Sequence, residues 1–416
     1  MDRETVIAGK VKEIKNEVQR ELEGRLDIDD EEVYRIIDEK IRCKNKKFTF
    51  MLSEKLYIRK NIFNAMRRLD VLQELIDDPT ITEIMVNGID SIFIERNGGL
   101  IDTGKSFDSK DRLCDIIQQI VAGVNRTVNA ASPIVDARLK DGSRVNVVLD
   151  PVALNGPILT IRRFPKKPID GEKLIEYGSV NSEVLELLKK LVKAKYNILI
   201  SGGTGAGKTT FLNVLSGYIS GDERIITIED SAELIIQGID NLVSLEARNV
   251  NTSGCNAISI RDLIKTALRM RPDRIIVGEV RGDESIDMLQ AMNVGQDGSM
   301  STIHANSAKD ALSRLETMMM LHTEIPLPAL RRQVASGIDI VIHLGRLRDK
   351  SRRLLEIREI TGIENNEISS SVIYKFTENG EEKGKIIGEH KRVGEIRSTY
   401  KLERAGLKTD QFVVGR

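Results

Sequence analysis

The sequence lacks the features of a secreted, disulfide-bonded or membrane-spanning protein. It has no tryptophan, and only 4% of its 416 residues are aromatic. Its three cysteines, Cys43, Cys114 and Cys255, lie far apart, without the paired spacing of a disulfide framework or a zinc site. The first residues are charged and carry no apolar signal-peptide core, and no long run of uncharged apolar residues occurs. We therefore expect a protein of the reducing cytoplasm, with peripheral contact at most to a membrane.

An excess of charge of either sign is also missing. Lys plus Arg and Asp plus Glu both number 63, so no global field exists to hold nucleic acid or an anionic bilayer. The chain is longer than the ~250–300 residues at which single cores stop growing. Its 40% hydrophobic and 30% charged residues are ordinary for globular proteins. We expect two or three folded domains.

Residues 1–68 show helical periodicity. Apolar residues recur at three- and four-residue steps from Ile7 to Leu22, which places them on one stripe of an amphipathic helix. A second stripe runs from Val33 to Ile41. This pattern predicts a helical N-terminal region, and it fits both a small bundle that packs on itself and an arm that docks onto a partner.

Residues 69–164 change to short β-type runs with turn signals between them, which predicts an α+β domain. The expected elements are strands at 81–86 and 92–95, a helix at 111–124, and strands within 133–149 and 159–164. Residues 165–180 begin with two prolines, Pro165 and Pro168, which disfavour a helix and predict a linker.

In residues 181–362, strands and helices alternate along the chain. Such alternation predicts an α/β domain, with a mostly parallel sheet covered by helices. Residues 363–416 are polar, with many Gly and Lys residues and a few β-like pieces, and we assign no structure to this tail.

The strongest motif is the phosphate loop at 202–209, which has the pattern G-x-x-x-x-G-K-[ST] between an apolar strand and a helical segment. Its glycines let backbone N–H groups point at the β- and γ-phosphates, and the helix adds its positive N-terminal end. Lys208 would supply a charge to the phosphate oxygens, and the Thr209 hydroxyl would ligate Mg²⁺. The expected ligands are ATP and Mg²⁺. The predicted nucleotide-binding residues are Gly202, Gly203, Thr204, Gly205, Ala206, Gly207, Lys208, Thr209 and Thr210.

Two acidic strand ends could complete such a site. An apolar strand delivers Glu229 and Asp230 to its carboxyl end, where α/β sheets bind ligands. A second strand ends at Glu279, with Gly278 where P-loop enzymes usually have an aspartate, so Glu279 would supply the carboxylate on the metal side. Each cluster by itself could also be a solvated strand end.

Histidine and arginine residues add further candidates. A Gly-rich turn from Gly295 leads into a short strand that ends at His304, which fits either a sensor of the nucleotide state or a packing role. Arg144 and the pair Arg162 and Arg163 lie before the predicted linker. They are either surface charge or planar cations that reach the γ-phosphate and close one domain on the other.

Together these motifs resemble the Walker A, Asp box, Walker B and His box of type II/type IV secretion ATPases. The stretches that carry the resemblance are the phosphate loop, Ile228–Glu233, Arg271–Gly282 and Ser301–Asn306. Outside the motor, the segments Thr82–Gly88, Ser132–Arg138, Asp141–Asn146 and Leu159–Phe164 resemble the assembly ATPases of tight-adherence (Flp) pili, the CpaF-like branch. The resemblance covers about Leu69 to Gly362 and includes no tetracysteine zinc motif.

The resemblance implies a RecA-like P-loop motor domain preceded by a PAS-like α+β domain. It also implies a hexameric cytoplasmic ATPase at the inner face of the cytoplasmic membrane, which works on an inner-membrane platform protein to assemble a pilus without direct contact to nucleic acid. Whether the same ring also retracts the pilus is left open. By position, Glu229 matches the catalytic base, Glu279 the Walker B glutamate that reaches Mg²⁺ through water, and His304 the His-box histidine. Arg144, Arg162 and Arg163 match the arginines that contact phosphate. A conjugation or type IV secretion ATPase, a retraction motor and a nucleotide-switched scaffold remain alternatives.

Overall fold

The computed structural model divides the chain into two compact units, Met1–Pro165 and Lys166–Arg416. The residues it describes are 3–23, 25, 28–46, 48–96, 98–124, 126–139, 141–163, 169–248 and 257–407. Cys255 and the two linker prolines lie outside these residues. Cys43 and Cys114 are free thiols. No helix in the described part of the chain combines the length and the apolar character needed to cross a bilayer.

The first unit begins with three helices, α1 (Arg3–Leu22), α2 (Asp30–Asn45) and α3 (Leu52–Arg67). The two apolar stripes expected from the sequence share one core with α3, in which Ile14, Ile37 and Ile62 are fully buried. The Asp29 carboxylate accepts a hydrogen bond from the Glu32 N–H and fixes the start of α2. These helices therefore form a bundle with its own core.

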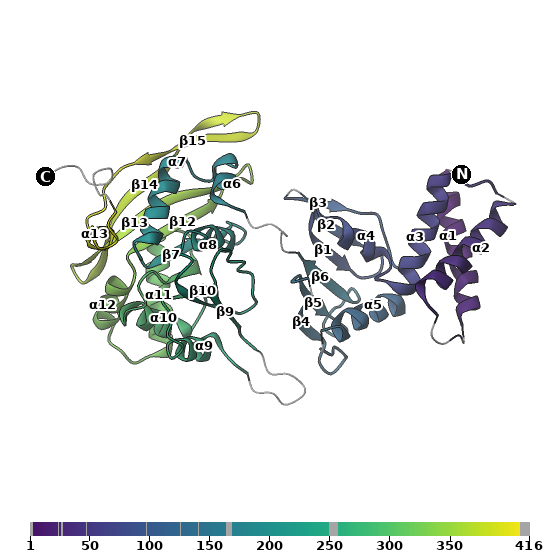
Figure 1. Ribbon diagram of the computed structural model, residues 1–416, viewed down its shortest axis with the longest axis horizontal. Helices are drawn as coiled ribbons and strands as arrows, with labels where there is room; N and C mark the ends of the chain where they lie inside the picture. The colour runs from purple at the N-terminus through teal and green to yellow at the C-terminus, as the bar shows by residue number, and fades with distance from the viewer. Residues whose placement is uncertain are drawn as a thin grey trace. The chain divides into compact units, whose positions relative to one another are not determined.

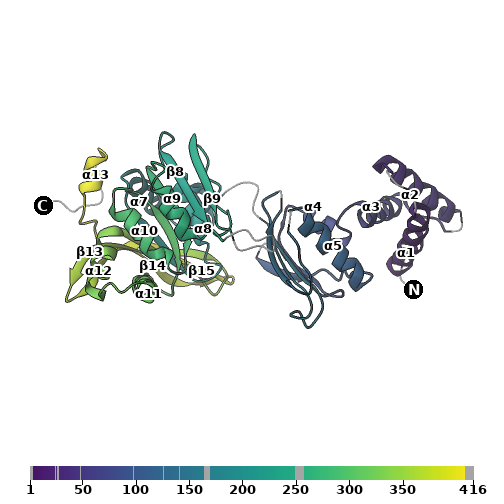
Figure 2. The same ribbon diagram turned by 90° about the horizontal axis from the view of Figure 1, so that it is seen from below.

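The rest of this unit is a six-stranded antiparallel sheet in the order β3-β2-β1-β6-β5-β4. The strands are β1 (Ile81–Asn87), β2 (Ile92–Arg96), β3 (Gly99–Asp102), β4 (Ile134–Arg138), β5 (Arg144–Val148) and β6 (Ile158–Arg162). Helices α4 (Val71–Asp77) and α5 (Lys110–Ala122) share one apolar core with the sheet and lie on the same face of it (Figure 2). Because side chains alternate along a strand, Arg144 and Arg162 belong to the face that these helices leave open.

The second unit is built on a nine-stranded sheet in the order β15-β14-β13-β12-β7-β11-β10-β8-β9 (Figure 1). The strands from β12 to β9 in this order are parallel, and β13, β14 and β15 are added antiparallel. The strand bounds are β7 (Ile198–Gly202), β8 (Arg224–Glu229), β9 (Asn241–Glu246), β10 (Arg274–Val280), β11 (Met300–His304), β12 (Ile340–Arg346), β13 (Arg352–Glu364), β14 (Glu367–Glu382) and β15 (Lys385–Arg392).

Helices cover both faces of this sheet, which confirms the predicted fold class. Ile198 and Ile200 of β7 pack with α7 and α8, whereas Leu199 packs with α9 to α12 on the other face. Strands buried on both faces read as continuous apolar runs, as β7 does. The helix bounds are α6 (Gly171–Glu176), α7 (Ser182–Lys193), α8 (Lys208–Ser216), α9 (Ile260–Ala267), α10 (Glu284–Asn293), α11 (Ala308–His322), α12 (Leu327–Gly337) and α13 (Tyr400–Arg404).

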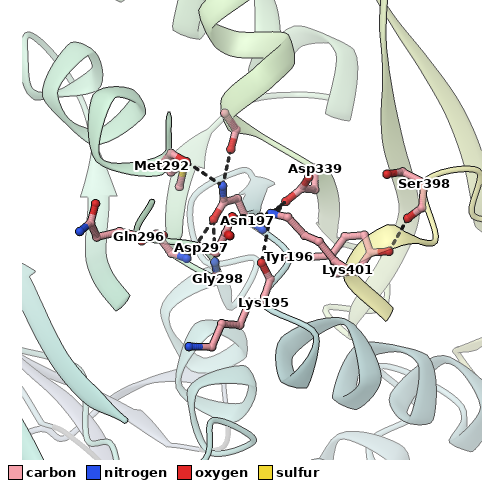
Figure 3. Close-up of polar contacts among 12 residues, drawn as sticks. Lys195, Tyr196, Asn197, Met292, Gln296, Asp297, Gly298, Asp339, Ser398 and Lys401 are labelled. Atoms are coloured by element: carbon pink, nitrogen blue, oxygen red, sulfur yellow. Dashed lines mark hydrogen bonds and ion pairs between the residues drawn. The ribbon is translucent and has the colours of Figure 1, made fainter. Parts of the chain in front are cut away.

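The described part of the tail after Ile363, to which the sequence assigned no structure, extends the sheet and includes α13. Ile396 and Leu402 are buried in the core beside β7. The Lys401 ammonium lies 2.7 Å from the Asp339 carboxylate and 2.8 Å from that of Asp297, and the Tyr196 hydroxyl donates to the Ser398 carbonyl (Figure 3). The tail is therefore part of the second unit's core.

Asn197, just before β7, bonds the ends of α10 and α12 and the loop before β11 at the amino ends of the parallel strands (Figure 3). Its side-chain amide donates to the carbonyls of Met292 and Gly337, at 3.3 and 2.7 Å. Its side-chain oxygen accepts from the N–H groups of Gly298 and Ser299, which precede β11. These bonds fix the starts of β7, β11 and β12 relative to one another.

Candidate nucleotide-binding site

The phosphate loop joins β7 to α8 and has the backbone that its glycines predict. Gly205 and Gly207 have φ angles of 72° and 92°, in the left-handed region that glycine adopts without strain. Gly202 lies against β12, since a Cβ there would come within 2.6 Å of the Leu344 carbonyl oxygen. The loop therefore needs glycine for two reasons, a positive φ at Gly205 and Gly207 and the close approach of β12 at Gly202.

Lys208, the first residue of α8, is only 8% exposed. Its ammonium donates to the carbonyls of Gly202 and Gly203, at 3.2 and 3.1 Å, and lies 3.3 Å from Nδ1 of His304. Burial lowers the pKa of Lys208, and the nearby Glu279 carboxylate partly opposes this shift. The ammonium is therefore desolvated before any phosphate is bound, which strengthens its attraction for an anion.

His304 connects the phosphate loop with the second acidic strand. It faces Gly202 in the β7–β11 register, and its Nε2 lies 2.9 Å from a carboxylate oxygen of Glu279. Burial, and then the Lys208 charge, lower the pKa of His304, so the imidazole is neutral at pH 7. The Glu279 oxygen in this contact accepts no hydrogen bond from the described residues, and the Lys208 ammonium lies at nearly equal distances from the two ring nitrogens, 3.3 Å from Nδ1 and 3.4 Å from Nε2. The Arg281 guanidinium extends this chain, at 2.9 Å from Glu279 and 3.5 Å from Asp230.

Glu229 ends β8 and is 3% exposed. One of its carboxylate oxygens accepts from the N–H groups of Glu233 and Leu234, at 2.8 and 3.0 Å, which fixes the orientation of the side chain. A Cβ at Gly278 would lie 2.9 Å from the Glu229 Cγ. Gly278 stands where P-loop enzymes usually have an aspartate. Because it has no side chain, it leaves room for the side chain of Glu229.

The sheet places several of the predicted site residues along one edge. Gly202, Glu229 and His304 end their strands, and Glu279 is the penultimate residue of β10. Thr209 and Thr210 follow Lys208 in the first turn of α8. No group of three or more His, Cys, Asp or Glu side chains that could hold a metal ion alone occurs among the described residues. Mg²⁺ fits this site through the Thr209 hydroxyl and nucleotide phosphates, because Mg²⁺ commonly binds through few protein ligands together with substrate phosphates and water.

The predicted arginines belong to the first unit. Arg144 lies directly opposite Arg162 on β6 and opposite Arg138 on β4, so three guanidinium groups follow one another across the open face of the sheet. Arg163 differs from them, because its guanidinium donates to the carbonyls of Asp78 and Ile81 within the same unit. The structure thus gives Arg163 a bracing role at the start of β1.

Two further arginines, Arg346 and Arg352, lie beside the phosphate loop and were missed in the sequence. Arg352 donates from Nε to the Gly205 carbonyl, at 2.9 Å. A Cβ at Gly205 would lie 3.7 Å from Nη1 of Arg346. The sequence offered one sign of them, five basic residues between 346 and 353. Such a density is ordinary for a solvated turn, so it did not point to the phosphate loop. Only the pairing of β12 with β7 shows that this turn reaches the loop.

A parallel sheet with a phosphate loop after one strand, and carboxylates at the ends of its neighbours, defines a RecA-like P-loop NTPase fold. Residues 66–405 match the family model described as type II/IV secretion system protein, and the chain belongs to this family. It is thus a member of the type II/IV secretion ATPase superfamily.

Curated relatives and a solved structure agree with this assignment. A putative conjugal transfer protein of Mycobacterium tuberculosis is 35% identical over 293 residues, which cover 69% of this chain and 83% of that protein. The conjugal transfer protein TrbB of Rhizobium radiobacter is 32% identical over 71% of this chain and 89% of its own length. The X-ray structure of the Yersinia pseudotuberculosis ATPase DotB shares the fold, with a TM-score of 0.51, 17% identity, and coverage of 69% of this chain and 76% of that one.

Proposed function

We propose that this chain hydrolyses ATP with Mg²⁺ and uses the energy to drive a pilus-assembly or secretion machine. The observation that carries the proposal is the contact chain from Lys208 through His304 to Glu279, which links the phosphate loop to an acidic strand. In this proposal His304 senses the γ-phosphate and Glu279 holds water around the metal, and the two side chains are in direct contact. Loss of the γ-phosphate would be transmitted from one strand to the next.

In this mechanism Lys208 neutralises charge on the phosphate oxygens, and Glu229 orients the attacking water for in-line displacement. Glu279 would hold a water molecule of the metal's hydration shell, and His304, in contact with Glu279, would keep this carboxylate in place. Bound Mg²⁺ supplies positive charge that stabilises the transferred phosphoryl group. Product release would then relax the contacts that the phosphate had ordered.

For the machine, we propose assembly of a Flp-type pilus by a hexamer on a membrane platform protein at the inner face of the cytoplasmic membrane. Support comes from the segments of the first unit that resemble the tight-adherence branch. The names of the relatives, which include conjugal transfer proteins, favour a second candidate, a type IV secretion or conjugation ATPase. Pilin and platform genes beside this gene would support the first candidate, and relaxase genes would support the second.

The motor proposal predicts that its partner stimulates ATP hydrolysis. The full chain would be assayed with Mg²⁺-ATP, with and without the cytoplasmic loops of the neighbouring platform protein, and its oligomeric state would be measured by light scattering. We expect a hexamer whose turnover rises several-fold with the loops. Turnover that does not respond to the loops would instead favour a nucleotide-switched scaffold.

The open-face arginines should act in turnover. We propose that Arg144 and Arg162 contact phosphate when the two units close, because both belong to the sheet face of the first unit that α4 and α5 leave open. We expect Arg144→Ala combined with Arg162→Ala to lower kcat about tenfold or more, because charge-assisted contacts to the transition state are lost. Steady-state kinetics would measure the change, with the exposed Arg20→Ala as control. Unchanged kcat in the double variant would make these arginines ordinary surface charge.

A further inference from the structure

The turn between β12 and β13 brings two arginines to the side of the phosphate loop away from the acidic strands. β12 pairs with β7 so that Leu344 lies opposite Gly202, where the loop begins. In the sheet order, β11, β10 and β8 lie on one side of β7, and β12 and β13 lie on the other. The loop therefore has carboxylates on one side and guanidinium groups on the other.

Both arginines are close to the loop itself. Arg352 donates from Nε to the Gly205 carbonyl, at 2.9 Å, and its Cδ would be 3.3 Å from a Cβ at Gly207. Nη1 of Arg346 would be 3.7 Å from a Cβ at Gly205. Because one nitrogen of Arg352 is used to bond the loop, its two terminal nitrogens stay close to the loop while keeping their own donor capacity.

The two guanidinium groups carry a charge that their surroundings do not neutralise. Arg346 and Arg352 lie directly opposite each other in the β12–β13 ladder, where like charges are unfavourable. Both side chains are exposed, and among the described residues neither has a carboxylate partner within 4 Å. Arg348, in the same turn, is bound instead to Glu378 and Glu381. An anion held between Arg346 and Arg352 would offset their repulsion.

We propose that Arg346 and Arg352 form a second anion contact of the nucleotide site, which binds the α- and β-phosphates of ATP and ADP. The inference rests on the proposed function, because it needs a nucleotide in the loop. The γ-phosphate must face Glu229 and Glu279, where water attacks, so the non-reacting phosphates face the β12–β13 turn. Guanidinium groups suit this role because their planar donors match phosphate oxygens. The pair holds substrate and product alike and takes no part in the chemical step.

Arg346→Ala, Arg352→Ala and the matched control Arg348→Ala test this inference in the full chain. Binding of fluorescent ADP and of a non-hydrolysable fluorescent ATP analogue would be titrated with Mg²⁺, and kcat and KM would be measured for ATP. We expect each of the first two variants to raise Kd for both nucleotides about tenfold, the size of one exposed charge-assisted contact. KM should rise with Kd, and kcat at saturating ATP should be unchanged, as for groups that bind ground and transition states equally. Arg348→Ala should match the unchanged protein.

The other outcomes overturn the inference in distinguishable ways. If Arg352→Ala alone raises Kd, the residue braces the loop and the pair is not an anion contact, because Arg346 makes no hydrogen bond to the loop among the described residues. A fall in kcat at unchanged Kd would make the arginines transition-state groups. If these variants raise Kd for ADP but not for pyrophosphate with Mg²⁺, the two arginines contact the nucleoside and not the phosphates. Failure of the unchanged chain to bind any nucleotide would overturn the proposed function itself.

Discussion

Lys208→Ala should abolish ATP hydrolysis and weaken Mg²⁺-ATP binding about a hundredfold or more. The ammonium is almost fully buried, its pKa is already lowered by burial, and the two loop carbonyls and His304 hold it at the phosphate position. Removing a preorganised charge from such a site costs far more than removing one in water. Nucleotide titration and single-turnover hydrolysis would measure the loss.

The control for this change is Lys193→Ala, which removes an exposed lysine from α7 in the same unit. We expect it to bind and hydrolyse ATP like the unchanged chain. Both variants should unfold at a similar temperature to the parent. Lys193 is exposed, and the buried Lys208 ammonium has no direct carboxylate partner among the described residues, so its removal breaks no ion pair. Normal hydrolysis by Lys208→Ala would remove the phosphate loop from the mechanism.

Glu229→Gln should leave ATP bound but lower turnover about 10²- to 10⁴-fold, the usual contribution of a positioned acid or base. The amide oxygen of glutamine can still accept from the N–H groups of Glu233 and Leu234, so the side chain keeps its place above Gly278. Only the charge that polarises water is lost. Equilibrium binding and single-turnover rates, measured on the same preparation, separate these two effects.

Two further variants test the assignment of the glutamates. Glu246→Gln, directly opposite Glu229 on β9, is the matched control and should turn over normally. Glu279→Gln should weaken the dependence on Mg²⁺ and loosen His304, so both binding and turnover should fall. Full turnover by Glu229→Gln, with inactivity of Glu279→Gln, would transfer the role of base to Glu279.

The sequence predicted the strand, the phosphate loop and the helix that begin the nucleotide site, because each has a local cause. β7 is a run of apolar residues buried on both faces, the loop has glycines where φ is positive, and α8 follows at once. The family and the RecA-like fold are confirmed by the comparisons, whereas the pilus branch and the roles of the site residues stay predictions.

What the sequence could not predict depends on register between distant segments. The contact of His304 with Glu279 requires β11 to lie beside β10, and the approach of Arg352 to Gly205 requires β12 to lie beside β7. Gly278 looked like the loss of a carboxylate, but it accommodates Glu229 from the neighbouring strand. We assigned no structure to the tail from the sequence because only a few of its residues, such as Ile396 and Leu402, face the core.

The carboxyl-terminal segment has a further consequence for handling the protein. Lys401 pairs with two acids, Asp297 and Asp339, which lie in the loops just before β11 and β12, and Arg404 adds a longer contact to Asp297. Burial already raises the pKa of Asp339, and Lys401 opposes this shift. Without Lys401 the Asp339 carboxyl would keep its proton to a higher pH, or water would enter at the amino ends of the strands to solvate its charge. A version of the protein shortened by a few tens of residues would therefore alter the far end of the strands that carry Gly202 and His304, although it removes nothing within reach of the nucleotide.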